Sequence, residues 1–70
     1  MKITSKLKKR IKGMIKIEIR WRRLFAAEFE TNAKAFEKYG EKRLTRQNRK
    51  EAARLLREAD ELAENLKKES

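Results

Sequence analysis

The chain has 70 residues, of which 21 are lysine or arginine and 11 are aspartate or glutamate, so its formal net charge is +10. It has no cysteine and no histidine, which excludes disulfide bonds, thiolate chemistry and the usual zinc sites. It also has no proline and only two glycines. A chain of this length forms at most one small domain, and a composition dominated by Lys, Glu, Arg, Ala and Leu favours helix.

Basic residues are concentrated in the N-terminal third of the chain. The first 23 residues contain ten basic side chains and a single acidic one, Glu18, which gives this third +9 of the formal +10. So many like charges repel one another unless an anion neutralises them. The sequence therefore predicts a partner contacted through this third, most simply a polyanion.

Apolar residues in the first half of the chain recur at helical spacing. They are Ile3, Leu7, Ile11, Met14, Trp21, Phe25, Phe29, Phe36 and Tyr39. Ser5 is a suitable N-cap for a helix that begins near residue 6, and Gly40 is a suitable left-handed residue after its C-terminus. One interpretation is therefore a single long helix over about 6–39.

A second helix is predicted over 45–68, with Thr45 as its N-cap. Its apolar residues follow a heptad pattern typical of a coiled coil: Ala52, Leu56, Ala59, Ala63 and Leu66, widened by Leu55 and Leu62. Folded back at Gly40, this helix is long enough to cover only about residues 17–39. The expected fold is one all-α domain, 1–70, an antiparallel helical hairpin. Its parts are a projecting basic amphipathic arm (1–16), helix one (17–39) and helix two (45–68).

An alternative interpretation treats residues 14–22 as a β-strand, because Ile17, Ile19 and Trp21 alternate with charged residues. A strand followed by two helices resembles the ribbon-helix-helix family of dimeric DNA-binding proteins, over about residues 15–60. The resemblance implies base-facing roles for Lys16, Glu18 and Arg20. Two departures are helices longer than that family needs and a 41–44 connection without a typical turn.

The charge pattern predicts a non-enzymatic nucleic-acid-binding protein, of DNA or RNA, that contacts phosphates and acts as a small regulator or accessory factor. A second basic series near the start of helix two adds to the N-terminal one. The candidate residues are Lys6, Lys8, Lys9, Arg10, Lys12, Lys16, Arg20, Arg22, Arg23, Arg46, Arg49 and Lys50. The alternative is a protein-interaction adaptor whose arm docks on an acidic and apolar groove of a larger protein, such as a ribonucleoprotein, or on a membrane surface.

The remaining expectations concern the core, self-association and chemistry. The residues expected to hold the two helices together are Phe25, Phe29, Phe36, Leu55, Leu56, Leu62 and Leu66. Such a core is thin, so a homodimer is expected. We expect the carboxylates of helix two to be solvated, and no catalytic residues, metal or cofactor. No signal peptide is apparent, so the expected location is cytoplasmic.

Overall fold

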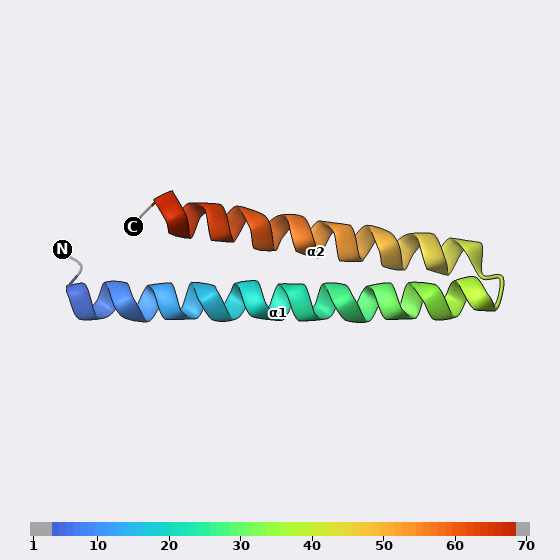
Figure 1. The fold of residues 1–70 in the computed structure, drawn as a ribbon, viewed down its shortest axis with the longest axis horizontal. Coiled ribbons are helices and arrows are strands. Elements are labelled where there is room, and N and C mark those ends of the chain that lie inside the picture. The colour runs from blue at the N-terminus through green and yellow to red at the C-terminus, as the bar shows by residue number, and fades with distance from the viewer. Residues whose placement is uncertain (1–3, 69–70) are drawn as a thin grey trace.

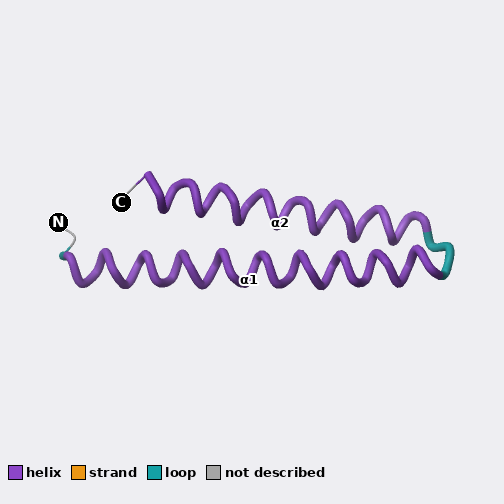
Figure 2. Tube along the Cα trace, in the orientation of Figure 1, coloured by secondary structure: helices purple, strands orange, loops and turns teal. Residues whose placement is uncertain are grey.

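The computed structural model describes residues 4–68 and contains two helices. Helix α1 spans Ser5–Lys38 and α2 spans Lys42–Lys68. The helices lie side by side and run in opposite directions, joined by a short turn (Figures 1 and 2). The expectation of an all-α helical hairpin is confirmed. Of the apolar residues expected on helix one, Ile3 lies outside the described residues.

The alternative with a strand over 14–22 is wrong, because these residues are helical and no strand occurs within 4–68. Ile15 and Ile19 are four residues apart, so in a helix both turn toward α2. A strand would instead place alternate residues on one face and, in this chain, leave its backbone groups without a paired strand. The ribbon-helix-helix resemblance therefore does not extend to the fold.

The turn is set by Gly40, whose φ of 75° is the positive-φ position within the described residues. The Gly40 amide donates to the Glu37 carbonyl at 3.1 Å, and the Glu41 amide donates to the Phe36 carbonyl at 2.9 Å. These two bonds form a Schellman motif, which satisfies carbonyls at the end of α1. The role expected of Gly40 is confirmed.

The helix starts differ from those expected. Thr4, rather than Ser5, caps α1, because its Oγ1 accepts a hydrogen bond from the Leu7 amide at 3.2 Å. Helix α2 begins at Lys42, three residues before Thr45. Thr45 is therefore not an N-cap: it is buried inside the helix, and its hydroxyl donates to the Glu41 carbonyl at 2.8 Å. The Schellman turn explains the early start, since it returns the chain to helix within two residues.

The buried contact between the helices is built mainly from small residues spaced by seven. Buried positions are Ile19, Ala26 and Ala33 on α1 and Thr45, Ala52 and Ala59 on α2. Between them lie half-buried residues at the complementary heptad positions, among them Ile15, Arg22, Phe29 and Phe36 on α1 and Asn48, Leu55 and Leu62 on α2. The half-buried Leu66 continues the heptad series of Thr45, Ala52 and Ala59. We call these buried and half-buried positions together the inner seam. Its three-four spacing is that of an antiparallel coiled coil.

The expected core is partly corrected by this heptad phase. Phe29, Phe36, Leu55, Leu62 and Leu66 do belong to the inner seam. Phe25 and Leu56 do not, since 43% and 45% of their surfaces are exposed. Each immediately precedes or follows a seam residue and so lies about 100° around its helix.

The molecule is a rod with principal extents of 55 × 17 × 15 Å. Helix α1 has 34 residues and α2 has 27. The N-terminal turns of α1 therefore extend beyond the C-terminal end of α2 (Figure 1). This end of α1 carries much of the basic charge.

Candidate nucleic-acid interface

Five basic residues follow one another along one side of α1. Their spacing of three or four residues places them on a common face of the helix. We call this row the basic flank: Lys9, Lys12, Lys16, Arg20 and Arg23. Part of it borders a depression of ≈ 380 Å³ between the helices, lined by Lys16, Ile19, Arg20, Arg23 and Ala63. The structure thus brings these predicted residues together on one side of the inner seam.

Three of the twelve predicted residues are paired with carboxylates. Arg22 contacts Glu18, and its Nε lies 3.4 Å from Oε1 of Glu58 on α2. The hydrogen bond that Arg22 donates to Glu18 raises the pKa of the Arg22 guanidinium, and Glu58 adds to the effect. Arg22 also belongs to the inner seam, with 30% of its side chain exposed. It therefore joins the helices and is poorly placed to bind a phosphate.

Arg23 and Arg49 are also engaged by carboxylates across the hairpin. Arg23 lies 3.9 Å from Asp60, and Arg49 contacts Glu37. These groups remain substantially exposed, so their pairing is weak and open to competition from phosphate. A phosphate would have to displace a carboxylate to bind either arginine.

The other nine predicted residues have no carboxylate within ion-pairing distance in the part of the chain that the structure describes. They are Lys6, Lys8, Lys9, Arg10, Lys12, Lys16, Arg20, Arg46 and Lys50. All are exposed except Lys12, which is half-buried. Their charges are therefore uncompensated within residues 4–68.

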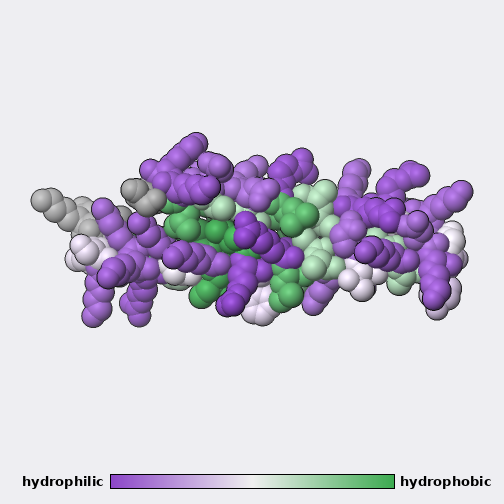
Figure 3. Space-filling view, in the orientation of Figure 1, coloured by the Kyte–Doolittle hydropathy of each residue, from purple (hydrophilic) through white to green (hydrophobic). Residues whose placement is uncertain are grey.

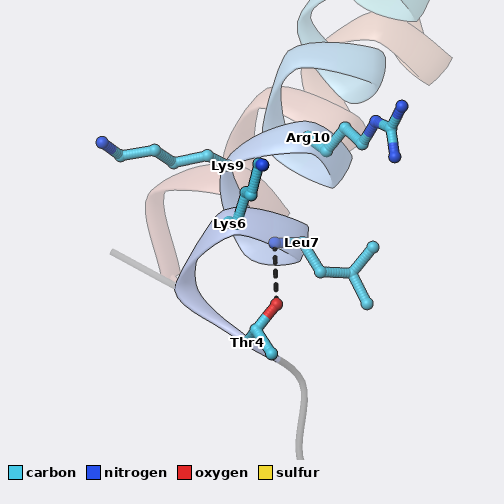
Figure 4. Close-up of a pocket in the computed structure, with 5 residues that line it drawn as sticks. All are labelled: Thr4, Lys6, Leu7, Lys9 and Arg10. Carbon is cyan, nitrogen blue, oxygen red and sulfur yellow. Dashed lines mark hydrogen bonds between the residues drawn. The ribbon is translucent and has the colours of Figure 1, made fainter.

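The N-terminal end of α1 is basic on several sides. A depression of ≈ 610 Å³ there is lined by Thr4, Lys6, Leu7, Lys9 and Arg10. In Figure 4 the side chains of Lys9 and Arg10 extend in opposite directions from the helix. The first turn contains no acidic residue, so its lysines oppose the helix dipole. An anion at this end would relieve that repulsion.

The second basic series lies at the other end of the hairpin. Arg46 and Arg49 line a depression of ≈ 440 Å³ at the turn, together with Glu37, Gly40, Lys42 and Thr45. The pairing of Arg49 with Glu37 fixes this placement, since Glu37 is the penultimate residue of α1. Because the helices are antiparallel, Arg46, Arg49 and Lys50 lie far from Lys6–Arg10, and one chain does not bring the two series together.

The carboxylates of α2 form ion pairs with α1, which the sequence did not predict. Glu58 and Asp60 contact arginines of α1 as well as solvent. Within α2, Arg54 pairs with Glu58 at 3.1 Å and with Glu51 at 2.7 Å, and the hydrogen bond from Arg54 lowers the pKa of the Glu51 carboxyl. Folding the two helices antiparallel places the acidic half of α2 beside the basic half of α1. The opposite net charges of these two segments were the sequence feature that could have predicted these ion pairs.

No metal-binding cluster of His, Cys, Asp or Glu occurs among the described residues. Within the same residues, neither helix is both long and apolar enough to cross a membrane. No protein-family model, curated protein or solved structure significantly matches this chain.

Proposed function

We propose that this protein is a non-enzymatic nucleic-acid-binding protein that acts as a homodimer. Its basic flank and the N-terminal end of α1 contact phosphates of DNA or RNA, as in a small regulator or accessory factor. The observation that carries the proposal is the set of nine basic residues without an ion pair in residues 4–68, seven of which lie within Lys6–Arg20.

The dimensions of the basic flank suit a phosphate backbone. Lys9 and Arg20 are eleven residues apart, which corresponds to about 16 Å along a helix. Lys12 and Lys16 lie between them. Several phosphates can therefore be contacted at once, and the release of their counterions favours binding. Such contacts carry no base sequence information, so low sequence specificity is expected.

A second candidate function follows from the large apolar side chains that α1 exposes. Leu7, Met14 and Trp21 are 43%, 62% and 49% exposed. Together with the basic residues they suit an adaptor that docks in an acidic, apolar groove or on a membrane surface. Nucleic acid satisfies the charges but not the apolar surface, so the two candidates differ in their dependence on salt.

The test is a titration of the full chain with random-sequence duplex and single strands at about 50 and 200 mM salt. Contacts with six or more phosphates predict that affinity falls by about 10³-fold or more between these concentrations. Apolar docking on a protein or vesicle predicts a much smaller change. No binding to either nucleic acid at the lower salt concentration contradicts the proposal.

A matched pair of variants tests the basic flank specifically. Lys16→Gln with Arg20→Gln removes two charges from the flank, and Lys34→Gln with Lys38→Gln removes two from elsewhere on α1. In the first variant, the slope of the logarithm of the binding constant against the logarithm of salt concentration should decrease as expected for the loss of about two phosphate contacts. The second should keep it nearly unchanged. Equal losses in both would show that only total charge matters.

A further inference from the structure

A second heptad pattern runs along α1 on a side that does not contact α2. Its members are spaced by three, four and three residues: Met14, Ile17, Trp21 and Leu24, which we call the outer seam. Their exposed fractions are 62%, 53%, 49% and 48%. Figure 3 shows apolar side chains between the helices and again on the side of α1 away from α2. Trp21 stacks on Phe25, with ring centroids 5.6 Å apart, so the apolar surface is continuous at this point.

A charged residue lies at each end of the outer seam. Arg10 precedes Met14 by four residues, and Glu28 follows Leu24 by four. Neither has an ion-pair partner within the described chain. From Arg10 to Glu28 the spacing is therefore four, three, four, three and four, which is the same in both directions.

We propose that the outer seam binds a second copy of this chain, with the two α1 helices antiparallel around a two-fold axis. The symmetric spacing then brings matching positions together. Met14 meets Leu24 of the second copy, Ile17 meets its Trp21, and Arg10 meets its Glu28. Because a two-fold interface is isologous, each of these contacts occurs twice. Four large apolar side chains per copy become covered, with an ion pair at either end.

The charges at the two ends favour a second copy over other occupants. An anionic lipid surface or an acidic helix would attract Arg10 but repel Glu28. A nucleic acid would in addition leave Ile17 and Trp21 exposed to the phosphates or to water. A second α1 running in the opposite direction matches the positive end with a negative one at both places and also buries the apolar centre.

The dimer deepens the proposed function. Its formation does not depend on nucleic-acid binding, but the purpose that we assign to it does rest on the proposed function. On α1 the basic flank lies to one side of the outer seam, and the surface that contacts α2 lies to the other. The two-fold axis is perpendicular to the plane of the paired α1 helices, so it places the same side of both seams on the same face of the dimer. Both basic flanks, including Lys16 and Arg20 of each copy, then share one face of the dimer, with both α2 helices behind it.

The proposal is tested by sedimentation equilibrium of the full chain in about 0.15 M salt without nucleic acid, over a wide concentration range. The wild-type mass should rise from 8.4 kDa toward twice that value. Arg10→Glu faces Glu28 of the second copy and should raise the dissociation constant roughly tenfold. Glu28→Arg should act similarly, and the double variant Arg10→Glu/Glu28→Arg should restore wild-type association, because it exchanges the two charges of each pair.

Lys34→Glu is the matched control, since it makes the same charge change as Arg10→Glu away from the outer seam. By lowering the repulsion between two chains of +10 it should leave association unchanged or strengthen it. Circular dichroism checks that each variant remains helical. A wild-type mass of one chain throughout, or an Arg10→Glu variant that associates as well as Lys34→Glu, would overturn the proposal. Neither result depends on whether the protein binds nucleic acid.

Discussion

The inner and outer seams of α1 differ in both burial and residue size. Two of the most buried positions of the inner seam hold small residues, whereas the outer seam exposes only large ones. The inner seam is buried at Ile19, Ala26 and Ala33, and alanine is among the smallest side chains. The outer seam exposes about half or more of four large side chains, from Met14 to Leu24. Within one helix, four large apolar residues therefore lie on the face that the hairpin leaves uncovered, whereas two of the three most buried positions hold alanine.

This difference shows what each face of the helix accommodates. Alanine at every seventh position lets two helix backbones approach closely, and it leaves no room for a larger side chain. Large residues bury more apolar area, but they require a partner at a greater distance or with complementary gaps. The inner seam is suited to a contact within the hairpin, and the outer seam to a contact made by another molecule.

Enlarging a buried alanine should give the largest effect on stability. Ala33 has no exposed surface, so Ala33→Leu forces the helices apart and should lower the free energy of unfolding by about 1–3 kcal/mol. Urea unfolding followed by circular dichroism measures this change. Ala53→Leu, at an exposed position of α2, is the control and should change stability by less than about 0.5 kcal/mol. Equal effects would mean that the alanine contact is not closely packed.

The two glycines should respond to alanine with opposite signs. Gly13 lies inside α1, and an added Cβ there meets nothing within 4 Å. Gly13→Ala should therefore stabilise the N-terminal half of α1, which carries the outer seam, by about 0.5–1 kcal/mol. Gly40→Ala should destabilise the turn by about 1 kcal/mol, because its φ of 75° is unfavourable for a Cβ. Thermal unfolding compares them, and a loss of stability in Gly13→Ala would contradict the described helix.

Changing the outer seam should give the smallest effect on the isolated hairpin. Met14 is 62% exposed, so Met14→Gln should change the free energy of unfolding by less than about 0.5 kcal/mol at high dilution. The same variant should weaken association, because the apolar contact with Leu24 of the second copy is lost. Unfolding at several protein concentrations separates the two effects. A large loss at high dilution would place Met14 in the hairpin core.

The sequence predicted the two helices and the break at Gly40, both of which depend on local spacing. It did not predict which face of α1 is buried. The size of their apolar side chains favours Trp21 and Phe25 as core residues. Ala26 and Ala33 have little apolar surface, and only their seven-residue spacing indicates that they are buried. Burial was decided by the fit between helices, which single-helix periodicity does not report.

The candidate site was predictable in its residue types and only partly in its arrangement. The basic flank follows from helical spacing once residues 9–23 are taken as helix. The neutralisation of Arg22 and Arg23 by Glu58 and Asp60 depends on the antiparallel register, which the Schellman turn at Gly40 sets. The outer seam was not predicted, because Ile17 fits the strand alternation of 14–22 as well as the heptad pattern.

The most direct test of the outer seam as a two-fold contact is the distance between identical spin labels on two copies. The chain has no cysteine, so Arg20→Cys and Lys34→Cys each accept one label, and pulsed electron paramagnetic resonance measures the separation. An antiparallel pair centred near residue 19 predicts less than about 25 Å for position 20 and about 45 Å or more for position 34, from the rise of 1.5 Å per residue. Similar short distances at both positions, or no interaction between labels at either, would contradict the account.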